Sequence, residues 1–212
     1  MKTKPYQNPT EETYFELQSA FDFFNDKLFN PKLPPCLITL QRHGRYNGYF
    51  SPSRFKHRHE NKNTDEIAIN PDYISQVDVT EALSTLVHEM VHLQQNHFGS
   101  PSRSGYHNKQ WGAMMESIGL IPSDTGEPGG KKTGQSMSHY IATNGLFEQT
   151  CGQLVKRGFT LSWGDTFGKQ EKQTHLGRIK YRCSLCKLNA WAKPAVTLVC
   201  GKCNEMLLVE EL

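Results

Sequence analysis

The chain has 212 residues, of which 36% are hydrophobic and 10% aromatic, so it can form one buried core plus a small appendage, and wholesale disorder is excluded. The formal net charge of +3 is unevenly spread: residues 1–155 hold 14 Lys and Arg against 16 Asp and Glu, and residues 156–212 hold 10 against 5. Residues 1–10 are polar and no run of about 18 apolar residues occurs, so we expect no export and no membrane insertion, and a cytoplasmic protein.

The first third of the chain predicts one helix followed by short strands. Apolar residues recur at three- and four-residue steps after Thr10, which predicts a core-facing helix of about 18 residues that ends near Asn30. Apolar and β-branched runs then predict three strands, and a polar, basic segment between the second and third predicts a mobile loop. The strands are expected at residues 36–41, 46–51 and 66–70, and the loop at 53–63.

A second helix carries the motif HExxH. It is predicted to start at Asp78, where a capping-box pattern begins, and to end at Gly99. Positions four apart share one face of a helix, so the rings of His88 and His92 can bind one metal ion. Glu89 lies beside them, close enough to act on a water molecule at the ion.

A third ligand is needed, because three protein ligands and one open position make a zinc site catalytic, whereas four make it structural. His107 begins the next amphipathic segment, where a hairpin can carry its ring back over His88 and His92. Glu116 is the alternative, because some HExxH sites are completed by a carboxylate from a following helix. The apolar stripe of this segment, which includes Trp111, is interpreted as core.

Such a site predicts metal-assisted peptide hydrolysis without a covalent intermediate. Zinc lowers the pKa of water to around 7, and Glu89 can take the proton and return it to the leaving nitrogen. We therefore expect a zinc metallopeptidase that acts on protein substrates. The alternative is a zinc-dependent nucleic-acid-binding adaptor whose HExxH site is inactive.

The segment Ser-Met-Ser-His-Tyr at residues 136–140 follows a Pro-, Gly- and Ser-rich loop. Because a Met turn and a nearby Tyr lie beside the metal in metzincins, His139 or Tyr140 could be close to the ion, and ordinary packing is the other interpretation. The compact metzincin motif is absent, since Gln95 stands where its Gly would be. The other histidines show no ligand spacing and are interpreted as surface or structural residues: His43, His57, His59, His97 and His175.

Four of the six cysteines form two tight pairs near the C-terminal end, Cys183 with Cys186 and Cys200 with Cys203. In a reducing compartment such pairs bind metal more often than they form disulfides, and this pattern predicts a four-cysteine zinc ribbon. The ribbon is interpreted either as a structural staple or as a DNA-binding module. Its basic and aromatic candidates for DNA contact are Lys180, Tyr181, Arg182, Lys187, Trp191 and Lys193.

These features together resemble the SprT-like zinc metallopeptidases. The resemblance runs from about residue 15 to Trp111 and covers the first helix, the strands around Gly48 and Ile67, and the HExxH helix. Members of this family often carry a C-terminal zinc ribbon, which fits the four cysteines. Residues 121–160 depart from the pattern, so their role stays open.

The resemblance implies a set of functional residues. His88, His92 and His107 would be the zinc ligands, Glu89 the catalytic base, and the strand ending at Asn70 a wall of the substrate cleft. It also suggests proteolysis of proteins associated with DNA, which would place the protein at the nucleoid or in the nucleus.

We therefore predict an α+β fold in two parts. Residues 1–167 are expected to form a zincin-like metallopeptidase domain with helices packed on a small sheet, and residues 168–212 a linker and a β zinc ribbon. Two zinc ions are expected, one catalytic and one structural. The expected partners are a protein substrate and DNA, with no membrane.

Overall fold

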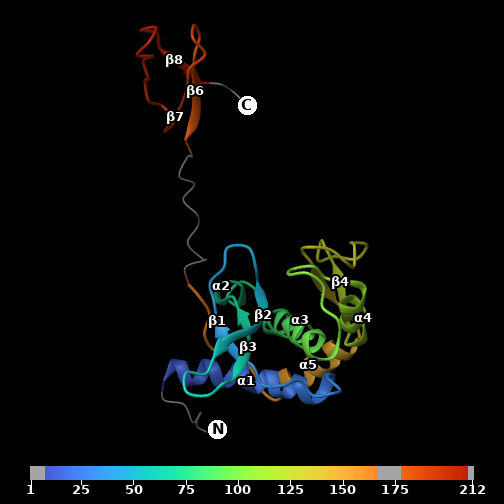
Figure 1. Cartoon of the computed structure of the whole chain (residues 1–212). Helices are drawn as coiled ribbons and strands as arrows, with labels where there is room; N and C mark the ends of the chain where they lie inside the picture. The colour runs from blue at the N-terminus through green and yellow to red at the C-terminus, as the bar shows by residue number, and fades with distance from the viewer. Residues whose placement is uncertain (1–7, 167–177, 210–212) are drawn as a thin grey trace. The chain divides into compact units, whose positions relative to one another are not determined.

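A computed structural model describes residues 8–166 and 178–209 of the chain. Its contacts divide the chain into two compact units, Met1–Gly168 and Lys169–Leu212 (Figure 1). The linker expected at residues 168–173 and His175 lie outside the described residues. The helices within the described ranges are all too short or too polar to cross a lipid bilayer.

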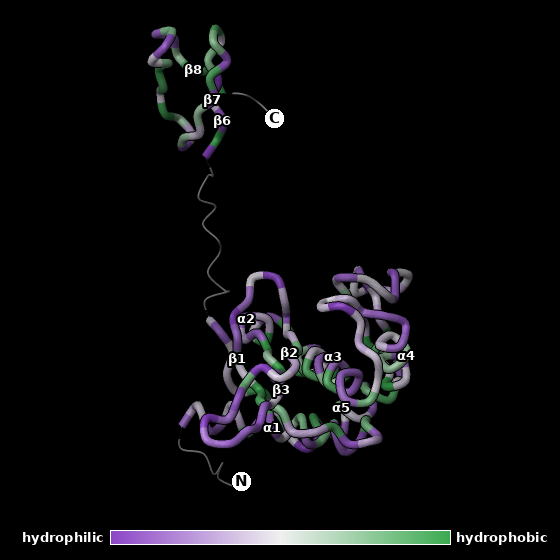
Figure 2. The backbone as a smooth tube through the Cα atoms, in the orientation of Figure 1, coloured by the Kyte–Doolittle hydropathy of each residue, from purple (hydrophilic) through white to green (hydrophobic). Residues whose placement is uncertain are grey.

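The larger unit confirms the α+β prediction: its described part contains helices, a three-stranded sheet and a two-stranded sheet. Figure 2 shows hydrophobic stretches along the helices, and their buried side chains belong to one shared core. The elements in chain order are α1 (Pro9–Leu28), β1 (Leu37–Leu40), β2 (Gly48–Lys56), β3 (Asn63–Ile69), α2 (Pro71–Ile74), α3 (Val79–Phe98), α4 (Lys109–Ser117), β4 (Leu120–Ser123), β5 (Ser138–Ile141) and α5 (Leu146–Lys156).

The three-stranded sheet has the order β1-β3-β2, with β1 parallel and β2 antiparallel to β3. The central strand β3 is almost entirely buried, and its two acidic residues have partners, as buried charges require. Asp65 accepts a hydrogen bond from the backbone N–H of Ser53 (2.6 Å), and Glu66 accepts one from the hydroxyl of Thr39 (2.7 Å). In the order β1-β3-β2 of the described strands, strand β2 pairs only with β3 and is therefore an edge strand of the sheet.

The polar segment 53–63 is not the loop that the sequence predicts. Strand β2 continues to Lys56 and β3 begins at Asn63, so only the turn between them is irregular. A register shift between Ser51 and Phe55 lets the pairing continue past the core. Side chains beyond this bulge are exposed, so the strand carries no apolar alternation that sequence patterns could detect.

Helix α3 lies at the centre of the larger unit. Its start at Asp78 and its end at Gly99 confirm the prediction: the Asp78 carboxylate accepts hydrogen bonds from the N–H groups of Thr80 (2.8 Å) and Glu81 (3.0 Å). The helix packs against β2 and β3 as well as α1, α4 and α5. Its middle is therefore buried on all sides, polar residues included.

The first helix starts slightly earlier than predicted. Asn8 caps it by accepting a hydrogen bond from the N–H of Glu11 (2.9 Å), and Pro9 occupies the first turn, where its missing N–H has no cost. Its buried face meets α5, where Phe24 stacks on Phe147 with ring centroids 5.6 Å apart.

The region 121–160, whose role the sequence leaves open, contains an antiparallel hairpin and α5. Strand β4 pairs with β5, so Pro122 stands opposite His139 and Ile121 opposite Tyr140. The backbone N–H of Phe147 bonds the carbonyl of Ile118 (2.8 Å), which ties α5 to the end of α4. The hairpin thus brings His139 to the larger unit's interior.

The smaller unit is a three-stranded antiparallel sheet of order β7-β6-β8. Its strands are β6 (Ile179–Cys183), β7 (Asn189–Ala192) and β8 (Leu207–Val209). Its small core consists of Tyr181, Cys183, Cys200 and Leu207. A core this small needs a further restraint to be stable, which two cysteine pairs supply when they bind a metal.

Gly48 lets β2 approach α3 closely. A Cβ placed there would lie 3.1 Å from the Thr85 methyl carbon and 3.3 Å from Glu89 Cγ, whereas one at Gly44 would meet nothing within 4 Å. Gly48→Ala should therefore destabilise the protein by about 1 kcal/mol or more through overpacking. The measurement is the free energy of unfolding in denaturant, with Gly44→Ala as the control. Equal stabilities for the two variants would contradict the close approach.

Candidate metal centre

Three histidines converge in the larger unit. His88 and His92 lie one turn apart on α3, and His107 precedes α4. One ring nitrogen from each of the three lies within 4.8 Å of the others, and the Nε2 atoms of His92 and His107 are 3.1 Å apart. The structure therefore brings together the three residues that the sequence proposed as ligands.

The backbone and ring of His107 are both held by Gly134. The two residues exchange backbone hydrogen bonds of 2.8 and 3.1 Å, and His107 Nδ1 lies 3.2 Å from the Gly134 carbonyl oxygen. A carbonyl only accepts, so His107 Nδ1 carries the proton and donates it. Nε2 of His107 is then left with its lone pair directed at the other two rings, as a metal ligand requires.

Burial keeps these imidazoles neutral. Desolvation lowers the pKa of His92 to about 3 and holds that of His88 well below its ordinary value. Desolvation also lowers the pKa of His107. Neutral imidazole nitrogen is a ligand for zinc, so the chemistry of this donor set fits that ion.

Glu89 lies in the same buried space. Burial raises the pKa of its carboxyl to about 8, and a hydrogen bond from the backbone N–H of Phe50 opposes that rise. Glu116, the alternative third ligand, lies apart on the exposed side of α4, where its carboxylate is 2.6 Å from Lys132 Nζ.

Trp111 underlies the histidines. It is fully buried, which confirms its interpretation as core. Its ring centroid also lies 5.0 Å from that of His88, 5.2 Å from His92 and 4.4 Å from His107. The spacing of apolar residues in α4 indicated that Trp111 is buried. It did not indicate the contacts with the three histidines, because these depend on how α4 packs against α3.

His139 lies next to the histidine cluster. The Nδ1 atom of His139 is 3.0 Å from Nδ1 of His88, and burial lowers the pKa of His139 to about 4. Tyr140 is not among the residues that line the cleft at this site. Of the two sequence interpretations for this segment, the one that places His139 close to the histidine cluster agrees with the structure.

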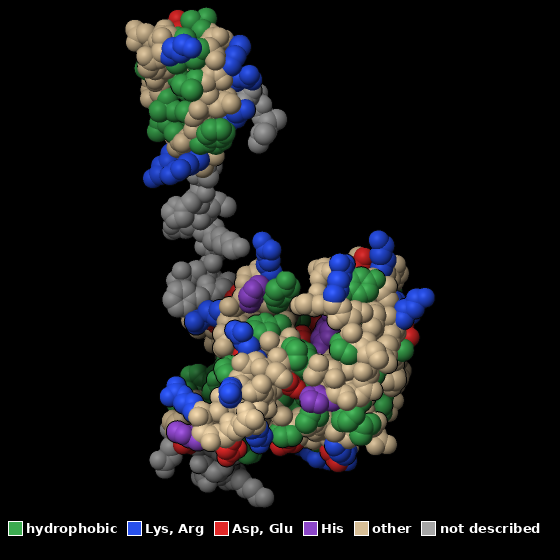
Figure 3. Space-filling view, in the orientation of Figure 1, with side chains coloured by type: hydrophobic (Ala, Val, Ile, Leu, Met, Phe, Trp, Pro, Cys, Tyr) green, Lys and Arg blue, Asp and Glu red, His purple; other side chains and the backbone are tan. Residues whose placement is uncertain are grey.

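The site opens into a cleft of about 870 Å³. Figure 3 shows this hollow, with histidine and acidic side chains at its base. Its walls are β2 from Gly48 to Phe50, the helix α3, and the loop before His107, and Arg45 and Arg103 are among the residues that line it. The strand that flanks the cleft is therefore β2 and not, as the sequence suggested, the strand ending at Asn70.

The remaining described histidines lie elsewhere. His97 Nε2 is 2.6 Å from a carboxylate oxygen of Asp65, and His43 stacks on Tyr46 with centroids 4.5 Å apart. His57 and His59 belong to the turn between β2 and β3, where the His57 ring accepts backbone hydrogen bonds.

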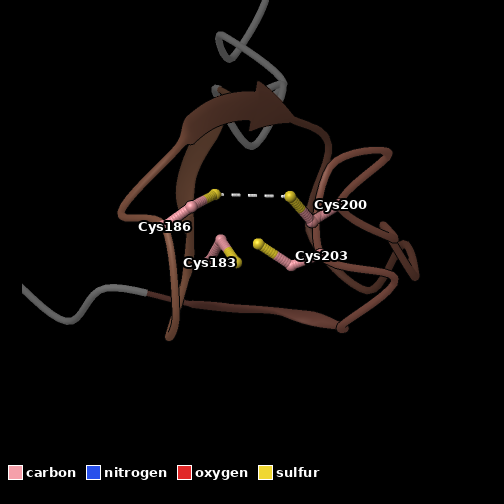
Figure 4. Close-up of side chains that lie close together, drawn as sticks. All are labelled: Cys183, Cys186, Cys200 and Cys203. Carbon is pink, nitrogen blue, oxygen red and sulfur yellow. Dashed lines mark hydrogen bonds between the residues drawn. The ribbon is translucent and has the colours of Figure 1, made fainter.

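The second group consists of four cysteines in the smaller unit, Cys183, Cys186, Cys200 and Cys203, whose sulfur atoms lie within 4.8 Å of one another. Figure 4 shows the thiols pointing toward one another, with Cys186 and Cys200 Sγ 3.5 Å apart. All four are free of disulfides. The backbone N–H of Cys186 lowers the pKa of Cys183 and favours its thiolate, whereas the neighbouring thiols, Cys186 first, raise the pKa of Cys203 in the metal-free cluster. This geometry is compatible with a zinc ribbon.

An HExxH helix packed beside a small sheet defines a metallopeptidase-like fold. Residues 17–128 match the model of the SprT-like family, so the chain belongs to that family. It is also 61% identical over 59 residues to the "Uncharacterized protein in mucB 3'region" of Salmonella typhimurium; these residues are 28% of this chain and 80% of that protein. No solved structure matches the chain.

The two candidate third ligands can be separated by metal content. His107→Ala should reduce bound zinc from two ions per chain to one, because two histidines alone hold zinc weakly. Glu116→Ala is the matched control and should keep both ions, since its carboxylate pairs with Lys132. The measurement is elemental analysis after gel filtration. Full metal in His107→Ala, with loss in Glu116→Ala, would reverse the assignment.

Proposed function

We propose that the protein is a zinc-dependent endopeptidase. One observation carries this proposal: the Glu89 carboxyl and three converging histidines lie in one cleft whose wall is the edge strand β2. A general base, a metal-binding group and a surface that can pair with an extended peptide are the parts that peptide hydrolysis needs.

The edge of β2 suits a polypeptide substrate. Within the described strands, β2 pairs with β3 on one side only. The N–H of Phe50 is hydrogen-bonded to the Glu89 carboxyl. Because the N–H and C=O of a strand residue point to the same side, the Phe50 carbonyl also faces the cleft, where it can accept a hydrogen bond from an extended chain. Such pairing would hold a peptide bond beside the site.

The residues of the site have separate roles in this proposal. When bound, zinc supplies Lewis acidity, which polarises a carbonyl oxygen and makes water easier to deprotonate. Glu89 accepts the proton of the attacking water and returns it to the leaving nitrogen. Burial raises the pKa of Glu89 in the metal-free site, and the charge of a bound zinc ion would lower it toward the range in which the carboxylate can accept a proton. His88, His92 and His107 hold the ion and Trp111 supports their rings.

Glu89→Gln should keep its zinc but lose activity by about 100-fold or more, because the amide cannot accept the proton. The measurement is cleavage of an unfolded protein such as casein, with and without single-stranded DNA, beside the zinc content of both proteins. Equal cleavage by variant and wild type would refute the base. No cleavage by wild type in either condition would favour the inactive, nucleic-acid-binding adaptor.

We also propose that the smaller unit contacts DNA, so that the substrates are proteins associated with DNA in the nucleoid or nucleus. Pairing of β6 with β7 and β8 places Lys180 beside Trp191, and Arg182 beside Leu208, on the sheet's open face. Trp191 is 59% exposed, which favours stacking on a base next to phosphate-binding cations. Tyr181 is buried on the other face and does not belong to this surface.

Trp191→Ala should weaken binding of single-stranded DNA by about 1–3 kcal/mol, the range found for one base–aromatic stack. Leu185→Ala is the control, because Leu185 is also a large exposed hydrophobic residue (64%) but lies in the turn between Cys183 and Cys186. The measurement is fluorescence anisotropy of a labelled oligonucleotide at several salt concentrations. Salt-independent binding, or equal losses in both variants, would contradict a DNA-binding face.

A further inference from the structure

We propose that His139 is a positioning residue: with Ser84, it fixes the proton of His88 on Nδ1 and so turns the lone pair of His88 Nε2 toward the other two histidines. This inference rests on the proposed metal site. It concerns a buried chain of polar atoms that the hydrolysis itself does not use, and it extends from β5 into α3.

The chain has four members. His88 Nδ1 lies 3.0 Å from His139 Nδ1, and His139 Nε2 lies 2.8 Å from Ser84 Oγ. Ser84 Oγ in turn donates to the backbone carbonyl of Glu81 at 2.8 Å. His88, His139 and Ser84 are all buried, which shields these contacts from most of the solvent.

The positions of the protons follow from the end of the chain. A carbonyl oxygen has no proton, so the single hydroxyl proton of Ser84 is given to Glu81. Ser84 Oγ can then only accept from His139, which puts the His139 proton on Nε2. A neutral His139 consequently has a bare Nδ1, which can only accept from His88. His88 therefore carries its proton on Nδ1 and has a free lone pair on Nε2.

This arrangement repeats for His88 what Gly134 does for His107. In both cases an acceptor holds Nδ1–H, which leaves Nε2 as the ligand atom and fixes the plane of the ring. Metal-binding histidines generally need such an outer partner, and its loss costs about 10–100-fold in metal affinity. His139 is not a member of the converging group itself.

The first test determines which ring nitrogen of His88 and of His139 carries the proton. In 15N-histidine-labelled, metal-free full-length protein, long-range 1H–15N correlation spectra should show His88 protonated on Nδ1 and His139 on Nε2. A proton on Nε2 of His88 would overturn the inference. Because this readout requires neither metal nor catalysis, it can succeed or fail independently of the proposed peptidase activity.

The second test is zinc affinity at the histidine site, measured by competition with a chromophoric chelator. His139→Leu should weaken zinc binding by about 10–100-fold. His139→Asn should stay within about threefold of wild type, because its side-chain oxygen can accept from His88 in place of Nδ1. Equal losses in both variants would show that His139 only fills space and would overturn the inference.

A milder variant covers the case in which His139→Leu does not fold. Ser84→Ala removes the acceptor that orients His139 and should weaken zinc binding several-fold. Ser117→Ala is matched to it, because Ser117 Oγ makes the same kind of bond to a carbonyl three residues back, that of Met114 (2.7 Å), without touching a histidine. Equal zinc affinity in Ser84→Ala, Ser117→Ala and wild type would overturn the inference.

Discussion

The larger unit depends on the burial of polar groups around the middle of α3. Four imidazoles and a carboxyl lie in or beside a space that the helix, the edge of β2 and the β4–β5 hairpin close off. Groups of this kind destabilise an interior unless each has a hydrogen bond or a metal ion as partner. The partners found here leave three ring nitrogens within 4.8 Å of one another, and the rest of the unit holds α3 in place around them.

The two candidate metal sites differ in the number of ligand atoms that they offer and in their access to solvent, as a reactive site and a structural site would. The histidine group offers three nitrogens and opens into a cleft beside Glu89, so a zinc ion held there would keep one position for a water molecule or a substrate. The cysteine group offers four sulfurs and closes the core of a small sheet that has few apolar residues of its own. Loss of metal should therefore affect the chemistry of one unit and the folding of the other.

Local patterns predicted the parts of the structure that local interactions determine. Helix α3 with its cap at Asp78, the shared face of His88 and His92, and the cysteine pairs all follow from spacing along the chain. The position of His107 could also be anticipated, because it lies just before a helix, where a hairpin can carry its ring back over α3.

The remaining features depend on contacts between distant segments. Strand β2 continues past the core, where no buried face marks it in the sequence, and it became the cleft wall because Gly48 permits its approach to Glu89. His139 follows the HExxH motif by nearly fifty residues, and only the pairing of β4 with β5 brings it to His88. The Ser-Met-Ser-His-Tyr segment made His139 a candidate, but its spacing could not decide between a place beside the metal site and ordinary packing.

The central claim is that one zinc ion is held by three histidine nitrogens beside Glu89. Diffraction from zinc-loaded crystals, collected on both sides of the zinc absorption edge, tests it most directly. The account predicts an anomalous peak about 2.0–2.1 Å from a nitrogen of each of His88, His92 and His107. A fully loaded protein whose zinc lies only among the four cysteines, with no peak between the histidines, would contradict it.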